Sequence, residues 1–178
     1  MDTLKDFKYK LIKNFFSPKE IKLLKQYCLL RLDGPWTSDP QCGYIAPSFF
    51  DDALMRYYHQ EKLKLVEKHS KLKLFKSYTY WRYYVYGSIL KTHIDRPSCE
   101  VSVTACISQT EQWPIHINNK WYKLNEGDAI YMQDMKCLMA ENLLQEILMP
   151  KYFFIMWIKM VHLHITKMIN LGRKIIDE

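Results

Sequence analysis

The sequence predicts an α+β domain in which helices come first and a barrel or sandwich of short strands follows. Residues 1–73 carry apolar side chains at helical spacing, whereas from residue 74 onward aromatic and β-branched residues lie between turn signals. The chain has 178 residues, 48% of them hydrophobic, which suits a single domain with a proper core. We therefore expect one domain with a helical part (1–73), a barrel core (74–137) and an atypical tail (138–170).

The helical part is expected to begin with an edge strand, Tyr9–Phe16, followed by a first helix. Ser17 and Glu20 have the spacing of a capping box, and Pro18 stands at the first helical position between them. This pattern fixes where the helix begins. The residues expected on its buried face are Ile21, Leu24, Cys28 and the leucines around Leu29.

A second helix is expected from about Ser48 to Lys68, after a loop over Asp33–Pro47 that is rich in glycine and proline. The apolar residues at helical spacing in this region predict its buried face. They are Phe49, Phe50, Leu54, Tyr57, Tyr58, Leu63 and Val66.

Charge and cysteine content limit the partners and the compartment. The net charge is +7, and the lysines between Lys62 and Lys76 could bind nucleic acid. No RNA-binding signature accompanies them. We therefore interpret these lysines as a solvated helix face and expect no nucleic-acid partner. The longest apolar run, Tyr152–Ile158, is too short to cross a bilayer, so no membrane partner is expected. Five cysteines without a CxxC pair, and no signal peptide, predict reduced thiols in a cytoplasmic protein.

The barrel core should consist of short strands. Phe75–Tyr86 is dense in aromatic residues and ends at Gly87, and a further extended stretch leads into His93. Apolar and polar residues alternate from Val101 to Ile107, as in a half-buried strand. The other expected elements are a hairpin of Trp113–Ile117 and Lys120–Leu124 around Asn118-Asn119, and a strand Ala129–Gln133 after the turn Glu126-Gly127-Asp128.

The pair of residues with the clearest chemistry is His93 and Asp95. On extended backbone, residues two apart project to the same side, so an imidazole nitrogen and a carboxylate oxygen would converge. These are two of the three ligands of a 2-His-1-carboxylate iron(II) site. A short HxD motif alone is commonly a surface hydrogen bond, so its surroundings decide the interpretation.

Those surroundings resemble a known family. From about Tyr78 to Asp134 the chain contains YxxG, HxD, TACIS, WPI before a hairpin, and EGDAIYMQ, in that order. This order is similar to that of the iron(II)/2-oxoglutarate-dependent dioxygenases, in their prolyl 4-hydroxylase-like branch. The resemblance implies a double-stranded β-helix, a jelly-roll or cupin-like barrel, with N-terminal helices packed on it. It also implies that Gly127 and Asp128 form the turn before the strand that leads to the third ligand.

The resemblance further implies a function and a site. Iron(II) would be bound by His93 and Asp95, with 2-oxoglutarate as cosubstrate beside Tyr86 and Thr104. Oxygen would be reduced with decarboxylation of 2-oxoglutarate to succinate, and an unactivated C–H bond would be hydroxylated. The expected substrate is a small molecule or a peptide, with proline or another amino acid as the reacting residue. The sequence carries no signal for an oligomeric state.

The third iron ligand is where the sequence departs from the family. The region that should supply a histidine, followed by a basic residue for the 2-oxoglutarate carboxylate, has the sequence QDMKCLMAENLLQE. Cys137 has a suitable position but is better interpreted as a structural cysteine. His162 and His164 lack the expected strand-turn context, and His116 should face the hairpin. The alternative function is therefore a catalytically inactive barrel that acts as a binding or remnant protein.

A shifted reading frame over Leu138–Asn170 would account for this departure. If each codon is read from one base earlier, Leu138–Glu141 can become His-Gly-Arg and Lys151–Val161 can become VFLHYVDKDG, both typical of the family. As written, the tail is expected to pack poorly on the barrel. The chain as written is also expected to bind iron(II) weakly and to turn over slowly or not at all.

Overall fold

A computed structural model describes residues 8–42, 46–85, 87–88, 90–94, 100–117, 120–133, 138–141 and 152–162. In this part of the chain the strands form two antiparallel sheets. The large sheet has the order β1-β8-β5-β10-β3-β2 and the small sheet the order β4-β9-β6-β7. The strands are β1 (Lys8–Ile12), β2 (Ser48–Phe50), β3 (Leu74–Val85), β4 (Leu90–Ile94), β5 (Val101–Gln109), β6 (Pro114–Ile117), β7 (Lys120–Lys123), β8 (Ala129–Gln133), β9 (Leu138–Glu141) and β10 (Tyr152–His162).

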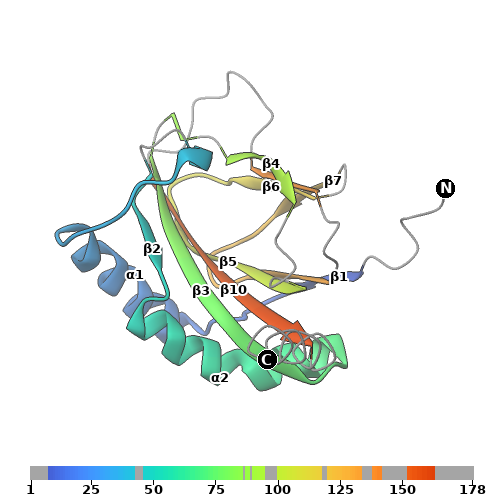
Figure 1. Ribbon diagram of the computed structural model, residues 1–178. Helices are drawn as coiled ribbons and strands as arrows, with labels where there is room; N and C mark the ends of the chain where they lie inside the picture. Colours follow the sequence, from blue (N-terminus) through green and yellow to red (C-terminus); the bar gives the residue numbers. More distant parts are fainter. Residues whose placement is uncertain are drawn as a thin grey trace, which may run out of the picture.

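The molecule has three layers. The helices α1 (Pro18–Leu32) and α2 (Ala53–Ser70) cover one face of the large sheet, and the small sheet lies over the other (Figure 1). The predicted α+β arrangement, with helices first and short strands after them, is thus confirmed. The two faces of the large sheet have different neighbours, and the candidate site lies on the face that is covered by the small sheet.

The first helix begins as predicted. The Glu20 backbone N–H donates to the Ser17 hydroxyl at 3.4 Å, and the Ser17 N–H donates to the Glu20 carboxylate at 2.7 Å, which closes the capping box. Leu24 and Cys28 are buried, but Leu29 is 54% exposed. The expectation for Leu29 was wrong because it lies about 100° around the helix from Cys28, outside the buried stripe.

The second helix begins five residues later than predicted, at Ala53. Ser48–Phe50 instead forms the strand β2, in which Phe49 stacks on Trp81 of β3 with ring centroids 3.9 Å apart. Asp52 caps the helix by accepting a hydrogen bond from the Leu54 N–H at 3.1 Å. Of the predicted buried face, Tyr58 and Val66 are buried in α2, Phe49 is buried in β2, Leu54 and Leu63 are half-buried, and Phe50 and Tyr57 are exposed.

The main apolar core lies between the helices and the large sheet. Its members come from both helices and from the large sheet's central strands. Among them are Leu24, Cys28, Met55, Val66, Trp81, Val103, Met156, Ile158 and Met160. Trp81, at 0% exposure, is the largest of these side chains.

The strand β5 is buried on both faces, whereas a half-buried strand was expected. Val101, Val103 and Ala105 pack toward the helices, and Ser102 and Thr104 are also buried, at 3% and 1% exposure. The alternation of apolar and polar residues is real, but the small sheet covers the polar face. The polar residues of β5 therefore line an interior, which sequence periodicity alone does not reveal.

The expectation that the tail packs poorly is wrong for Tyr152–His162. This segment forms β10, which pairs with β3 on one side and β5 on the other in the middle of the large sheet. Met156, Ile158 and Met160 are fully buried against the helices. No helix in the described ranges is long and apolar enough to cross a membrane.

The predicted edge strand, hairpin and turn are present. β1 stands at one edge of the large sheet beside β8, and β6 pairs with β7 as a hairpin, while Asn118-Asn119 lie outside the described residues. Gly127 has φ +86°, and a Cβ there would lie 2.8 Å from the Phe16 carbonyl oxygen, so the turn requires glycine. Asp128 accepts hydrogen bonds from Lys13 Nζ and from the N–H groups of Asn14 and Asn125. This turn ties β8 to the start of the helical part.

Candidate functional site

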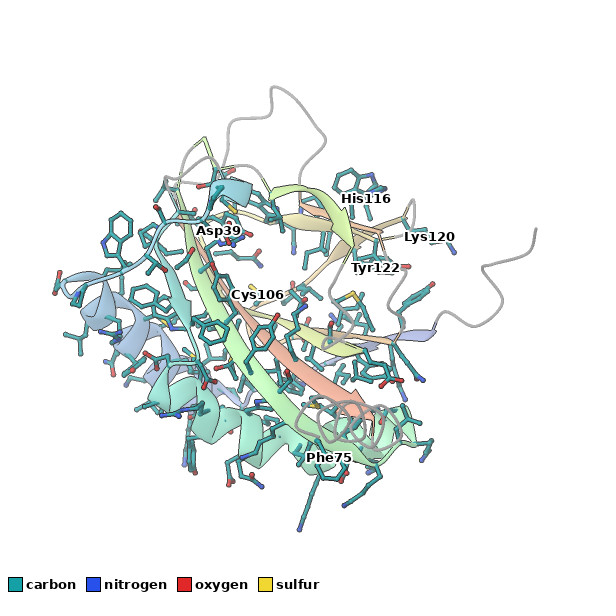
Figure 2. The ribbon with its side chains drawn as sticks, in the orientation of Figure 1. Asp39, Phe75, Cys106, His116, Lys120 and Tyr122 are labelled. Atoms are coloured by element: carbon teal, nitrogen blue, oxygen red, sulfur yellow. The ribbon has the colours of Figure 1, made fainter. Side chains whose placement is uncertain are left out.

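The inner face of the large sheet supplies a polar set of side chains. Residues that alternate with the helix-facing core point toward the small sheet, where Tyr84 and Cys106 pack with Leu90, Ile115 and Ile117. Figure 2 shows Cys106 in the space between the sheets. The polar or sulfur-containing residues of this inner face are Tyr80, Arg82 and Tyr84 from β3, Ser102, Thr104 and Cys106 from β5, and Lys159 from β10.

The strand register arranges the inner face in rows. Lys159 stands opposite Ser102 on one side and Tyr78 on the other. The next row joins Thr104 and Tyr80 through Trp157, and the row after it joins Cys106 and Arg82 through Ile155. Directly opposite residues of antiparallel strands share a face, so the described side chains of a row, such as those of Ser102 and Lys159, lie on the same face of the sheet.

Lys159 and Thr104 are two of the buried polar residues of the inner face. Lys159 is only 5% exposed, and its Nζ donates a hydrogen bond to the Ser102 hydroxyl at 3.2 Å. Thr104 is 1% exposed, and its Oγ1 has no hydrogen-bond partner among the described residues. A buried hydroxyl without a partner is costly, which makes Thr104 a position where a ligand would be accommodated.

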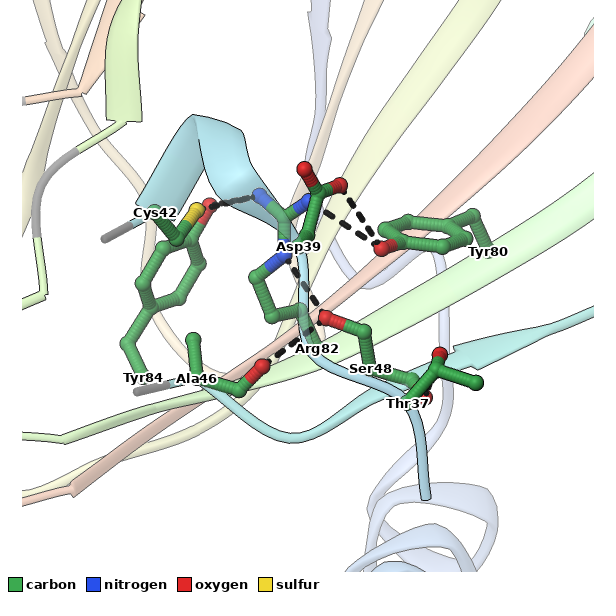
Figure 3. A network of polar contacts seen from close by, with 8 residues as sticks. All are labelled: Thr37, Asp39, Cys42, Ala46, Ser48, Tyr80, Arg82 and Tyr84. Carbon is green, nitrogen blue, oxygen red and sulfur yellow. Dashed lines mark hydrogen bonds and ion pairs between the residues drawn. The ribbon is translucent and has the colours of Figure 1, made fainter. Parts of the chain in front are cut away.

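Arg82 is the centre of a second polar cluster, shown in Figure 3. Its side chain is 2% exposed, and all three of its nitrogens donate hydrogen bonds. Nε donates to Ser48 Oγ at 3.2 Å, Nη1 to Cys42 Sγ at 2.7 Å and Tyr84 Oη at 3.0 Å, and Nη2 to Asp39 Oδ2 at 2.5 Å and Tyr80 Oη at 3.1 Å.

The Arg82 cluster fixes the loop that precedes β2. Asp39 and Cys42 belong to this loop, and the Ser48 hydroxyl also donates to the Ala46 carbonyl at 2.9 Å. The short 3₁₀ helix Pro40–Cys42 in the same loop contacts β4. The guanidinium therefore holds loop, large sheet and β4 together at one side of the inner space.

The predicted iron ligand His93 lies on β4, whose neighbour is β9. In this pairing His93 stands opposite Met139, and Ile94 stands opposite Leu138. In the strand register, position 139 is thus level with His93 and position 138 with Ile94. Asp95, Tyr86 and Cys137 lie outside the described residues, so only Thr104 and the backbone of His93 are placed. No group of three histidine, cysteine or acidic side chains suited to a metal occurs within the described ranges.

The same register bears on the frame hypothesis. A codon read from one base earlier takes two bases from the residue that it replaces, so the histidine of His-Gly-Arg would replace Met139. In the register of β4 and β9 that position stands opposite His93. In β10 the shifted frame would place aspartates at the positions of Ile158 and Met160, both fully buried in the apolar core. The packing of β10 thus supports the sequence as written over Tyr152–His162.

Sequence reasoning missed Arg82, Asp39, Tyr84 and Lys159 as parts of the inner space. The available signals were a single arginine within the aromatic run YTYWRYYV and a single lysine within an apolar run. His116 faces the hairpin as predicted, with its ring 4.7 Å from that of Trp121. The backbone of His162 stands opposite Leu74 at the end of β10. His164 lies outside the described residues.

Comparison with known proteins shows which solved structures share this architecture. No family model and no curated protein matches the chain. Solved structures do match in fold. A viral collagen prolyl hydroxylase from Paramecium Bursaria Chlorella virus-1, solved with 2-oxoglutarate, has a TM-score of 0.64 at 13% identity, over 85% of this chain and 94% of that one. A prolyl-4-hydroxylase from Pseudomonas putida has a TM-score of 0.64 at 12% identity, over 85% and 91%.

A third solved structure widens the range of proteins with this fold. HygX from Streptomyces hygroscopicus, solved with nickel and 2-oxoglutarate, has a TM-score of 0.61 at 10% identity, over 87% of this chain and 83% of that one. At these identities the likeness concerns the fold. The chain therefore has the fold of the 2-oxoglutarate oxygenases, as its motif order indicated.

Proposed function

We propose that this protein is an iron(II)- and 2-oxoglutarate-dependent oxygenase that hydroxylates an unactivated C–H bond within a double-stranded β-helix. The proposal rests on the combination of the HxD motif with the fold of the 2-oxoglutarate oxygenases. The HxD histidine lies on β4 of the small sheet, and that sheet covers a polar inner face in a fold shared with solved 2-oxoglutarate oxygenases.

The metal would be held by His93 and Asp95. Iron bound together with 2-oxoglutarate supplies the activation of oxygen that C–H hydroxylation requires. The sequence supplies two of the three usual protein ligands, and we assign the third position to Met139, which stands opposite His93 in the register of β4 and β9. A thioether is a soft ligand and a poor substitute for imidazole on iron(II). We therefore expect weak iron binding by the chain as written.

The 2-oxoglutarate would lie against the inner face of the large sheet. Its distal carboxylate requires a cation, and Arg82 already directs all three of its nitrogens to protein groups. Among the described residues, Lys159 is the other buried cation of the inner face, one row from the Thr104 hydroxyl. We assign Lys159 as the carboxylate anchor, with Thr104 and Tyr86 as hydrogen-bonding groups beside it.

The substrate is proposed to be a small molecule or a peptide, with a prolyl residue as the first choice. Two of the matched structures are prolyl hydroxylases, and HygX has also been solved with hygromycin B. Cys28, Cys42 and Cys106 are buried and form no disulfide with one another, which suits a reducing compartment such as the cytoplasm.

A matched pair of variants tests the metal site. Met139→His introduces an imidazole opposite His93 in the strand register, and Leu138→His introduces the same group one position away, opposite Ile94. Met139→His should raise iron(II) affinity and succinate formation from 2-oxoglutarate by at least about 10-fold, and Leu138→His should change neither. His93→Ala in the Met139→His background should abolish the gain. An equal gain in both variants would contradict the proposed geometry.

The second candidate function is a barrel that binds without catalysis, and Met139 is the observation that favours it. Succinate formation by the wild-type chain distinguishes the two candidate functions. Iron-dependent succinate formation that His93→Ala abolishes supports the enzyme. If 2-oxoglutarate binds, and the wild type forms no succinate while Met139→His does, the natural chain is a binding protein on an oxygenase scaffold.

A further inference from the structure

A surface cavity of about 290 Å³ lies beside β2, the last strand of the large sheet beyond β3 (Figure 1). Its walls come from the end of α1, from loop residues 35–37 and from β2 itself. Two large rings in these walls, Trp36 and Phe50, are 47% and 65% exposed. Large exposed rings that share one hollow indicate a binding surface, and a cavity of this size suits a short segment or a small group.

The outward edge of β2 is paired only at its first residue among the described residues. The Ser48 N–H donates to the Thr37 carbonyl at 2.9 Å, and the Thr37 N–H donates to the Ser48 carbonyl at 3.1 Å. Figure 3 shows Thr37 beside Ser48. The Asp51 N–H, by contrast, donates inward to β3 at 2.8 Å. Because backbone direction alternates along a strand, Phe50 directs its N–H and carbonyl outward, as Ser48 does.

These two backbone groups of Phe50 have no hydrogen-bond partner in the part of the chain that the structure describes. The pairing of Thr37 with Ser48 is antiparallel, so its continuation would bring Pro35 opposite Phe50. Proline has no N–H to donate, and the Phe50 N–H makes no hydrogen bond to the Pro35 carbonyl. The pairing therefore stops at Thr37, and the cavity lies where it stops. A backbone donor and acceptor remain open there, as at any unpaired sheet edge.

Arg31 brings a positive charge with unused donors to the same cavity. Its Nε donates to Asp52 Oδ2 at 3.1 Å, and its guanidinium carbon lies 5.0 Å from the centroid of the Phe49 ring. The Asp52 side chain is 5% exposed, and its other oxygen accepts hydrogen bonds from Tyr27 Oη and the Leu54 N–H. Nη1 and Nη2 of Arg31 have no hydrogen-bond partner within the described ranges. The guanidinium is thus oriented by the protein, with two nitrogens open to a carboxylate.

We propose that the outward edge of β2 binds an extended peptide in which an acidic residue stands next to an apolar one. The peptide backbone exchanges two hydrogen bonds with Phe50, which is β-strand addition. The residue paired with Phe50 shares its face of the sheet and packs beside its ring, and Trp36 supplies a second apolar wall. The next residue projects to the face of Phe49, where Arg31 receives its carboxylate. This binding needs neither iron nor 2-oxoglutarate and does not depend on the oxygenase function.

Anisotropy of the fluorescein-labelled peptide Gly-Ser-Val-Glu-Val-Ser-Gly, measured without iron and 2-oxoglutarate, tests the proposal. Wild type should bind it with a dissociation constant below about 1 mM, as expected for a short segment with few contacts. The same peptide N-methylated at both valines loses the backbone donors and should bind at least about 10-fold more weakly.

The contact with Arg31 has its own test, a double-mutant cycle across the interface. Arg31→Met should weaken binding of the glutamate peptide about fivefold, because a partly exposed ion pair is lost. The same variant should bind Gly-Ser-Val-Gln-Val-Ser-Gly within about twofold of wild type, since that peptide has no carboxylate side chain for Arg31. An equal loss for both peptides would overturn the assigned role of the charge.

The aromatic wall is tested by a matched pair of tryptophan variants. Trp36→Ala should weaken binding of the glutamate peptide about fivefold or more. Trp121→Ala removes a ring that is 41% exposed on β7 and should stay within about twofold of wild type. Circular dichroism confirms that each variant is folded.

Four outcomes would overturn the proposal as a whole. They are no saturable binding by wild type at about 1 mM protein, equal binding of the N-methylated peptide, equal losses in the two tryptophan variants, and competition by N-acetylglutamate as strong as that of the unlabelled peptide. The last would show that the cavity takes free carboxylates and that the edge of β2 plays no part.

Discussion

The two faces of the large sheet are built from the same strands and serve different ends. Toward the helices, β3, β5 and β10 present Trp81, Val103 and Ile158 in a closely packed apolar layer. Toward the small sheet, the neighbouring residues are Arg82, Thr104 and Lys159, all buried and all polar. Adjacent residues of one strand thus belong alternately to the apolar core and to the proposed site, and substitutions one position apart should have different consequences for stability and for 2-oxoglutarate binding.

The largest contrast is expected between Ile158 and Lys159. Ile158→Asp places a carboxylate in the fully buried apolar layer and should cost roughly 3–5 kcal/mol of unfolding free energy. Lys159→Met keeps the shape on the inner face and should change stability by less than about 1 kcal/mol, because an apolar residue replaces a buried ion. It should, however, weaken 2-oxoglutarate binding. Urea unfolding and calorimetric titration measure the two effects, and equal losses of stability would remove the distinction between the faces.

The Arg82 cluster is the place where the inner face also supports the fold. Arg82→Met removes the guanidinium that donates to Asp39, Tyr80 and Tyr84 and should cost roughly 3 kcal/mol. Loop 33–47 should then be cut faster by protease. The control is Arg31→Met, which removes the Asp52 ion pair at a partly exposed site and should cost about 1 kcal/mol or less. Unchanged proteolysis of the loop in Arg82→Met would show that Asp39 and Cys42 are held by other contacts.

The helical layer should carry the acid sensitivity of the protein. His59 on α2 is 2% exposed, and burial, with Lys76 nearby and only partial compensation by Asp51, lowers its pKa to about 4. The unfolded chain binds this proton near pH 6.5, so stability is complete above that pH and is lost as the pH falls toward 4. The loss between pH 7 and pH 4.5 should be about 2 kcal/mol. His59→Leu should flatten this part of the stability curve, and a curve that keeps its slope would place the titration elsewhere.

The smallest effect on stability should come from Thr104. Thr104→Val removes a buried hydroxyl that has no partner among the described residues, so unfolding free energy should stay constant or rise by about 1 kcal/mol. The affinity for 2-oxoglutarate should fall, and Thr104→Ser should retain it. Unchanged affinity in Thr104→Val would remove Thr104 from the proposed site.

The sequence predicted most of the architecture because its local signals are strong. The capping box of Ser17 and Glu20, the break at Gly87 and the turn at Gly127 each depend on residues close together in the chain. Ser48–Phe50 was misassigned because the stacking of Phe49 on Trp81, a contact between distant segments, overrides its helical spacing.

The candidate site was less predictable for the same reason. His93 and Asp95 are recognisable as a local motif, but the rows that join Ser102 with Lys159 and Cys106 with Arg82 exist only through strand register. The tail was misjudged because an apolar run without turn signals has the same composition whether it packs poorly or fills the centre of a sheet. Only pairing on both sides distinguishes the two cases.

The central place of β10 has a consequence for how the protein is made. The ribosome releases β2, β3, β5 and β8 before the strand that joins them, because β10 comes later in the chain than both of its neighbours. Until it emerges, β3 and β5 each present an open edge that can pair with another nascent chain. A message truncated before codon 152 would therefore yield an aggregating fragment, and the cell's chaperones would meet this protein chiefly at that moment of its synthesis.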